Sequence, residues 1–335
     1  MQPTYRIVAD GADITSAIKD RLLDLQLTDK PGLQSDTFQL SLDDRDGAIT
    51  LPPRGAALDV HMGYAGQPLS HMGRYVVDSI VYSGAPNTLL IKGKAADMLG
   101  TGKTQRSGSW ENTTLAAVVR DISARNGWTA LCPVEIALAR VDQVCESDYH
   151  LITRLARQHD CTAKLNNTCL MVLQRHAGSS ASGRELPVKL LNRGVISGFR
   201  FTVDDRQVQA AVSVFYQDAD GVLQTVRVTN AKKKDAVVAE FTDRHPQPNH
   251  KAALQTAQAR LAAFNRQTAG VHLDMPGCAD LFAELPVQLK GFKSGIDGEY
   301  LIDQVSQHFT RTGWTTSIEC NAGSAEAQKT EAKKT

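Results

Sequence analysis

Short runs in which apolar residues alternate with polar ones fill both ends of the chain, and this pattern restricts the fold to one built mainly from β-strands. In the N-terminal part, turn-forming pairs such as Asp10-Gly11 and Asp46-Gly47 separate the runs. The runs cover residues 5–9, 23–27, 38–42, 58–64, 75–82 and 89–91. About six strands can close a small barrel, which would remove exposed sheet edges. We therefore predict a first β-barrel domain over residues 1–97.

From about residue 113 the apolar residues recur at helical spacing. The stripe of the first predicted helix consists of Leu115, Val118, Val119 and Ile122. A cap at Thr113 or Thr114 opens this helix, and Gly127 closes it. A second predicted helix begins after a Ser147 cap, with Asp148 favourable at its positive end.

The two helices belong to a small α+β unit in the middle of the chain. Residues 161–165 and 168–173 flank an Asn-Asn turn and are predicted to form a hairpin. A segment rich in Gly and Ser follows at 176–184 and is predicted to be a loop or linker. The sequence therefore predicts an inserted α+β domain over residues 98–185.

Strand patterns return in the last third of the chain, around a long helix. The predicted strands cover residues 199–203, 210–216, 222–228, 287–292, 300–305 and 314–320. The helix is predicted over 249–269, with Asn249 as its cap. These elements define a second β-barrel domain over 186–322, followed by a disordered tail at 323–335 that has no apolar anchor. The predicted fold class is mainly β with an inserted α+β unit, two similar small β-barrels and one long helix.

A weak internal repeat links the two β regions. In each region a Gly-aromatic pair precedes a strand of the form Gly-x-Tyr-aliphatic-aliphatic-Asp. The matched strand residues are Gly73, Tyr75 and Asp78 in the first copy and Gly298, Tyr300 and Asp303 in the second, which are 225 positions apart. Repeats at a fixed offset are typical of duplicated domains. Recurrence of Gly turns and Tyr-rich strands by β-propensity alone is the alternative.

Composition argues against several classes of function. The 335 residues carry 37 Lys and Arg against 36 Asp and Glu, so the formal charge is +1. A near-neutral chain offers no general electrostatic attraction to nucleic acid or to an anionic membrane. No stretch approaches the roughly 18 to 20 apolar residues of a membrane span. We therefore expect no membrane binding by the chain itself and no sequence-specific nucleic-acid binding.

Candidate metal and nucleotide sites are incomplete. Cys161 and Cys169, with His150 and His159 nearby, lack the close pairing typical of zinc sites. Residues 100–104 end like a phosphate loop but lack its first glycine, and the residues after Thr104 are predicted to form a loop instead of the helix that a phosphate site needs. We expect no cofactor and no metal.

Catalytic motifs are incomplete as well. The SxxK of Ser16 and Lys19 stands without its companion motifs, and residues 218–221 read as a hairpin turn instead of a calcium loop. The basic run at 232–234 is expected to be solvated. A pair of carboxylates for glycan hydrolysis leaves no fixed spacing and stays open as an alternative.

The order of several short motifs resembles the late control D family of contractile-tailed phages. The matching segments are Pro3 to Thr15, Leu22 to Asp29, Ser35-Asp36, Leu42 to Gly47 and Gly73 to Tyr75. A central signature, Asp142, Gln143, Glu146, Ser147 and Asp148, is similar to an element shared by phage baseplate hubs and the N-terminal part of type VI secretion spike proteins. The resemblance covers most of residues 1–322.

This resemblance implies a structural baseplate hub: a homotrimer in the virion tail, assembled in the host cytoplasm, that joins a six-fold tail tube to a three-fold central spike. Tail tube protein, spike protein and other baseplate proteins are the implied partners. Under this interpretation the repeat and signature residues serve the fold and not catalysis. A tail-associated cell-wall hydrolase and the hub part of a secretion spike are the alternatives.

Overall fold

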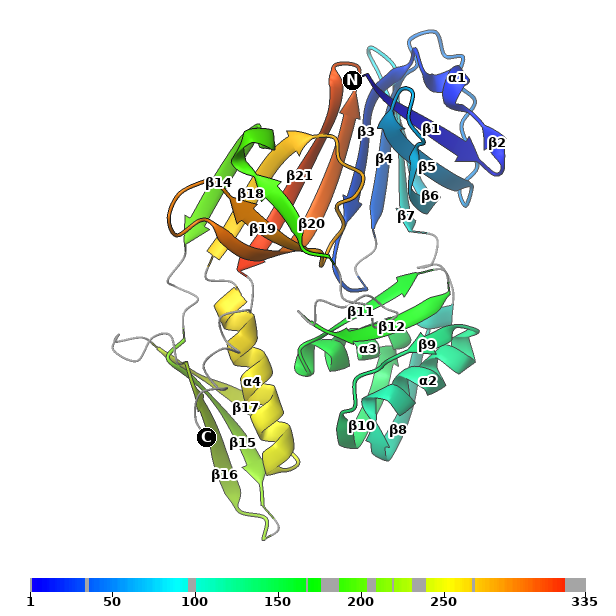
Figure 1. Cartoon of the computed structure of the whole chain (residues 1–335). Coiled ribbons are helices and arrows are strands. Elements are labelled where there is room, and N and C mark those ends of the chain that lie inside the picture. The colour runs from blue at the N-terminus through cyan, green and yellow to red at the C-terminus, as the bar shows by residue number, and fades with distance from the viewer. Residues whose placement is uncertain are drawn as a thin grey trace.

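The computed structural model describes residues 2–33, 36–95, 101–166, 168–175, 187–203, 209–218, 220–230, 239–266 and 269–322. Strands dominate, as the alternation predicts. A large sheet forms the upper part of the molecule in Figure 1, and two smaller units lie below it. One unit contains α2 and α3, and the other contains α4.

The first β region alternates as its sequence does. Its elements are β1 (Pro3–Ala9), β2 (Ala12–Asp13), α1 (Thr15–Ile18), β3 (Leu22–Asp29), β4 (Thr37–Asp43), β5 (Ala57–Tyr64), β6 (Ser70–Ser83) and β7 (Thr88–Ala95). Alternate residues such as Leu25 and Leu27 on β3 and Leu40 on β4 point into one core. Every neighbouring pair of strands in this region is antiparallel.

The second β region continues the same sheet. Its elements are β13 (Lys189–Asn192), the 3-10 turn η3 (Arg193–Val195), β14 (Gly198–Val203), β18 (Ala269–Pro276), β19 (Pro286–Lys290), β20 (Gly298–Thr310) and β21 (Gly313–Ala322). The sheet runs β14-β18-β21-β20-β3-β4-β7-β6-β5-β1-β2, with β19 and β13 on a branch from β20. The prediction of two separate barrels therefore needs correction: β20 pairs with β3, and the described strands form one open sheet.

In the inserted unit, α2 begins and ends at its predicted caps, and α3 begins at its predicted cap. It contains the 3-10 turn η2 (Thr101–Lys103), β8 (Gln105–Thr114), α2 (Leu115–Asn126), β9 (Thr129–Leu131), β10 (Ala137–Ser147), α3 (Asp148–Gln158), β11 (Cys161–Asn166) and β12 (Cys169–Gln174). Thr114 Oγ1 accepts from the Ala117 N–H, and Gly127 ends α2 with a φ of 71°. The segment after Thr104, predicted as a loop, is instead strand β8, paired with β10.

The long helix packs against a sheet of its own. This unit contains β15 (Ala211–Gln217), β16 (Leu223–Thr229), β17 (Glu240–Gln247) and α4 (His250–Arg266). The predicted cap is confirmed, since the Asn249 side chain accepts from the Ala252 N–H at 2.9 Å. The sequence places β15 and β16 in the second barrel, and the structure corrects this: β15 pairs with β16 and with β17 in a separate sheet, whose core lies against α4. The loop at 176–184, the basic run at 232–234 and the tail at 323–335 lie outside the described residues.

Candidate functional site

The two β regions have the same strand order. In the first region six strands run β3-β4-β7-β6-β5-β1, and in the second they run β14-β18-β21-β20-β19-β13. β6 thus corresponds to β20, and β3 corresponds to β14. The single difference in direction is that β13 runs parallel to β19, whereas β1 runs antiparallel to β5.

Asp78 and Asp303 occupy matching irregularities. The β6–β7 register shifts between Val77 and Ser79, so Asp78 is the extra residue. The β20–β21 register shifts between Ile302 and Gln304, so Asp303 is the extra residue there. A bulge bends a strand and increases its twist, and both long strands therefore bend at the same point of the repeat.

The repeated tyrosines are buried at equivalent places. Tyr75 is 4% exposed and Tyr300 is 8% exposed, and both hydroxyls donate to a backbone carbonyl a few residues upstream, of Met72 and Ile296 respectively. Burial raises the pKa of both phenols. Gly73 and Gly298 differ more: Gly73 has a φ of +143° and the Tyr75 ring close above it, whereas a Cβ at Gly298 would meet only an ordinary contact at 3.9 Å.

The two regions meet at a seam between β20 and β3. Six residue pairs run from Val305 opposite Asp29 to Thr310 opposite Asp24. Side chains from both regions share a core there, because the Tyr5 and Phe309 rings lie 5.0 Å apart, edge to face. The seam therefore fixes the two β regions as one rigid sheet.

Among the described strands, β6 and β14 each have an open edge, and they correspond in the repeat to the two strands of this seam. β6 pairs with β5 only up to Val76, so its edge on that side carries no strand from residue 78 to 83 within the described part of the chain. β14 pairs only with β18 among the described strands. Both open edges expose large apolar side chains: Val81 (43% exposed), Tyr82 (49%), Phe199 (43%) and Val203 (61%). Exposed apolar edges of this kind are templates for pairing with another chain.

The signature residues Gln143 and Asp148 form a buried network. The Asp148 carboxylate is fully buried and accepts from Arg125 Nε at 3.0 Å, Asn126 Nδ2 at 2.7 Å and Gln143 Nε2 at 2.9 Å. Arg125 Nη2 also donates to Gln143 Oε1 at 2.9 Å. The network joins β10, α2 and α3, so Gln143 and Asp148 stabilise the packing of the inserted unit.

The other signature residues surround this network. Ser147 Oγ accepts from the His150 N–H at 3.2 Å and caps α3. Glu146 pairs with Arg154 at 2.8 Å and with His150 at 2.8 Å. Asp142 is exposed and pairs with Arg140 at 2.9 Å. No pair of carboxylates in this group is left free for acid–base chemistry.

A second charged cluster holds the inserted unit against the sheet. Lys164 Nζ on β11 lies 2.7 Å from Asp29 Oδ1 and 3.6 Å from Asp36 Oδ2. Asp29 Oδ2 also accepts from the Ala283 N–H at 2.8 Å, so one carboxylate contacts both β regions and the insert. Burial raises the pKa of Asp36 to about 6, with Lys164 opposing the shift and the Asp29 carboxylate adding to it.

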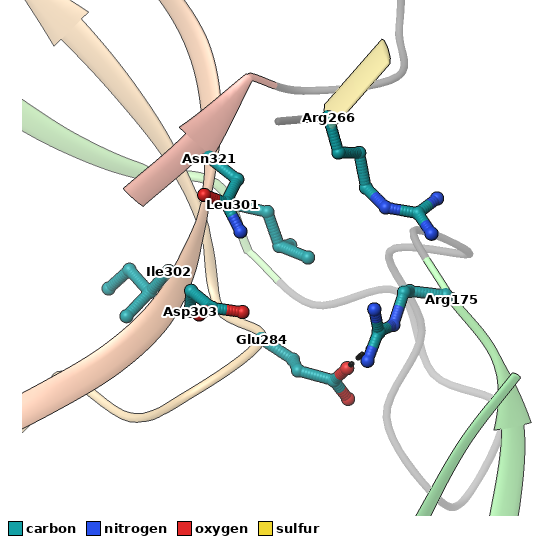
Figure 2. Close-up of a pocket in the computed structure, with 7 residues that line it drawn as sticks. All are labelled: Arg175, Arg266, Glu284, Leu301, Ile302, Asp303 and Asn321. Carbon is teal, nitrogen blue, oxygen red and sulfur yellow. Dashed lines mark ion pairs between the residues drawn. The ribbon is translucent and has the colours of Figure 1, made fainter. Parts of the chain in front are cut away.

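Figure 2 shows the neighbouring small cavity, where the three units of the molecule meet. The cavity has a volume of about 10 Å³, room for about one water. Arg175 Nε lies 3.9 Å from Glu284 Oε1, and Thr162 donates to the same carboxylate. Arg266 at the end of α4 pairs with Asp160 of the insert at 2.6 Å. Burial raises the pKa of Glu284.

The residues of the candidate metal and nucleotide sites make other contacts in the structure. In the described part of the chain no group of three or more His, Cys, Asp or Glu is arranged to hold a metal ion. Cys161 Sγ instead lies 3.4 Å from the His159 carbonyl oxygen. Gly102 packs against Trp128 and Tyr149 in a 3-10 turn. No described helix is long and apolar enough to cross a membrane.

Sequence reasoning missed the open edges and the partner of Asp148. Val81, Tyr82 and Phe199 read as ordinary strand residues, because alternation cannot tell a buried face from an exposed edge. Arg125 lies 23 positions before Asp148, and its pairing depends on how α2 packs on α3. The one available signal was an acid directly after a helix cap, which favours a helix start and says nothing of a partner.

Comparison with solved structures shows which known proteins share this fold. A tail protein from Neisseria meningitidis MC58 shares the fold with a TM-score of 0.73 at 14% identity, over 97% of this chain and 98% of that one. A component of the Escherichia coli type VI secretion system, c3393, aligns with a TM-score of 0.55 at 11% identity, over 90% of this chain and 73% of that one. The chain therefore shares its fold with this tail protein and with this secretion-system component.

Sequence comparison defines the family. The model of the phage tail baseplate hub (GPD) family matches residues 35–313. A probable baseplate hub protein of Escherichia phage 186 is 30% identical over 360 aligned positions, covering 95% of this chain and 92% of the phage protein. The chain belongs to the phage tail baseplate hub family, as its short motifs predicted, and its function is that of a hub in the phage tail baseplate.

Proposed function

We propose that this hub acts as a closed ring of three copies, in which the open edge of β6 on one copy pairs with β14 of the next. The observation that carries the proposal is the intramolecular seam. β20 and β3 already pair within the chain, and their counterparts in the repeat, β6 and β14, both have an open edge among the described strands. The same contact repeated between copies would leave neither edge exposed.

The repeat also predicts the register of this second seam. β20 residues correspond to β6 residues 225 positions earlier. The strand pairings can be followed from β6 through β7 and β4 to β3, and likewise from β20 through β21 and β18 to β14. At the end of these two paths, Leu27 matches Phe201 and Leu25 matches Phe199. Transferring the β20–β3 pairs places Ile80 opposite Val203, Val81 opposite Thr202, Tyr82 opposite Phe201 and Ser83 opposite Arg200. Two of these four pairs, Ile80 with Val203 and Tyr82 with Phe201, join hydrophobic side chains. Such cross-strand pairs stabilise a sheet.

Such a ring reconciles two symmetries. Three copies with two similar β regions each present six similar surfaces, which suits a six-fold tail tube, while the ring remains three-fold towards a central spike. The smaller units lie below the sheet in Figure 1 and leave the seam strands free. Tail tube, spike and other baseplate proteins are the proposed partners, and assembly takes place in the host cytoplasm.

The uncovered face of the sheet suits the inside of such a ring. The opposite face carries the apolar cores. The uncovered face near the seam is polar, with His308 paired to Asp24 and His272 2.8 Å from Glu319. A polar inner wall is compatible with a water-filled channel.

A structural role is favoured over hydrolysis. The signature acids are held in ion pairs and hydrogen bonds, and the relatives are named as hub proteins. We therefore propose that the protein is not an enzyme. Clearing of purified peptidoglycan by the isolated protein, abolished by one carboxylate substitution, would overturn this.

Mass measurement tests the trimer. Light scattering of the full chain alone should give three times the chain mass of 36.3 kDa, and with its spike protein it should give that mass plus the mass of the bound spike. The reason is that each copy contributes one β6 edge and one β14 edge, so a closed ring satisfies both. A stable monomer in both samples at micromolar concentration contradicts the proposal.

A further inference from the structure

A groove separates the inserted unit from the unit that carries α4. Its volume is about 740 Å³, within the range of about 300 to 1,000 Å³ typical of ligand sites. One wall consists of residues 137–142 of β10 and part of α3. The other consists of the end of β17, which includes Pro246, then Pro248 and the first turns of α4. One hydrogen bond joins the two walls, from Gln158 Nε2 to Gln247 Oε1 at 3.2 Å.

The β10 wall presents a strand edge. Six consecutive residues, 137–142, line the groove, whereas a strand facing it with its side chains would contribute alternate residues. β10 pairs with β8 on one side and with no other described strand. On the side away from β8, the Asp142 carbonyl accepts from Arg154 Nη2 at 2.8 Å. Because backbone groups alternate in direction along a strand, those of Leu138 and Arg140 point to this same side.

The opposite wall cannot accept a strand in the same way. Pro246 and Pro248 lie at the groove, and proline has no backbone N–H to donate. Residues 137–142 contain no proline. Of the two facing edges, β10 is therefore the one open to pairing.

Charge and buried polar groups indicate what the groove accepts. Four arginines line it against two aspartates, and Arg157 is exposed with no ion-pair partner among the described residues. Behind this wall, Glu111 and Glu146 pair with Arg140 and Arg154. At the floor, His159 (6% exposed) and Thr256 (3% exposed) have side-chain N and O atoms without a described hydrogen-bond partner. Buried polar groups without partners are rare in folded proteins.

We propose that the groove binds an extended segment of a partner protein, which adds as a strand to β10 at residues 137–142 and places an acidic side chain on Arg157. Backbone pairing supplies the affinity and the side-chain pair supplies selectivity. The chain's own last thirteen residues, with three Lys and two Glu, have the wrong charge for this site.

A peptide titration tests this on the full chain, whatever its oligomeric state. The probe is a fluorescein-labelled Thr-Val-Glu-Val-Glu-Val-Thr peptide, followed by anisotropy. A peptide with Lys in place of Glu, and one with N-methylated backbone amides, should bind about tenfold more weakly or not at all. Arg157→Glu should weaken binding of the Glu peptide by about fivefold. Arg120→Glu, an exposed arginine on α2 outside the groove, is the matched control and should bind as the parent does.

Hydrogen exchange identifies the edge that is used. The Glu peptide should slow exchange of amides within residues 137–142, in the trimer or in a monomer alike, so this result does not depend on the ring. Equal binding of the Glu and Lys peptides, binding without protection of 137–142, or no binding at about 1 mM peptide overturns the proposal. Self-association that protects 137–142 and disappears in Arg157→Glu also overturns it, because the occupant is then a second copy.

Discussion

At the scale of single residues, close packing decides which positions tolerate change. A Cβ at Gly277 would lie 1.9 Å from the Trp314 ring, which itself packs on Tyr64 across the seam with ring centroids 5.3 Å apart. The Tyr64 hydroxyl donates to the Gly277 carbonyl at 2.9 Å. This glycine is therefore required by the close approach of the Trp314 ring within the second β region, a requirement that no local sequence pattern reveals.

Gly277→Ala should lower the free energy of unfolding by about 3 kcal/mol, because the Trp314 ring must move out of a packed core. Gly270→Ala is the matched control, since a Cβ there meets nothing within 4 Å. Urea unfolding of both variants measures the difference. Equal losses in the two variants would show that Trp314 adjusts without cost.

Asp36 should make stability fall as pH rises. Its pKa in the folded protein is about 6, above the ordinary 3.8, so the folded state binds more protons than the unfolded state between these values. Asp36→Asn removes this titration. Its unfolding free energy relative to the parent should therefore rise by about 2 kcal/mol from pH 4 to pH 7. Denaturant unfolding at both pH values measures this, and a difference that stays constant contradicts the assignment.

At the scale of elements, local signals were sufficient wherever one element's own residues decide its ends. Thr114, Ser147 and Asn249 cap their helices as predicted, because a cap bonds within its own first turn. β8 was missed because its residues, Gln105 to Thr114, carry few apolar side chains and no alternation. The assignment of β15 and β16 failed for another reason: strand propensity does not say which sheet a strand joins.

The Asp148 network should hold β10 to both helices of the insert. Asp148→Ala should cost about 3 to 5 kcal/mol, since it leaves Arg125 and Gln143 without their buried partner. Asp142→Ala, which breaks an exposed pair with Arg140, should cost less than about 1 kcal/mol. Thermal unfolding of the full chain compares them, and similar losses would contradict a structural role for Asp148 in particular.

At the scale of the whole molecule, the sequence predicted the repeat but not how its copies join. Tyr75 and Tyr300, with the bulges at Asp78 and Asp303, are local features that recur at a fixed offset. The pairing of β20 with β3 joins residues more than 270 positions apart, and its register depends on the whole sheet. The prediction of two closed barrels is not confirmed, because the described strands of the two regions continue as one sheet through the β20–β3 pairing.

The most direct test of the ring is a disulfide across the proposed second seam. Val81 and Thr202 are both exposed, and the transferred register places them opposite each other, at a Cα separation of about 5 Å that a disulfide can bridge. Val81→Cys with Thr202→Cys should give covalent dimers and trimers, and nothing larger, on mild oxidation. Val81→Cys with Arg200→Cys, shifted by two residues, should not, nor should the parent with its six free cysteines. Absence of the trimer band for the first pair, or an equal yield from the shifted pair, would contradict the account.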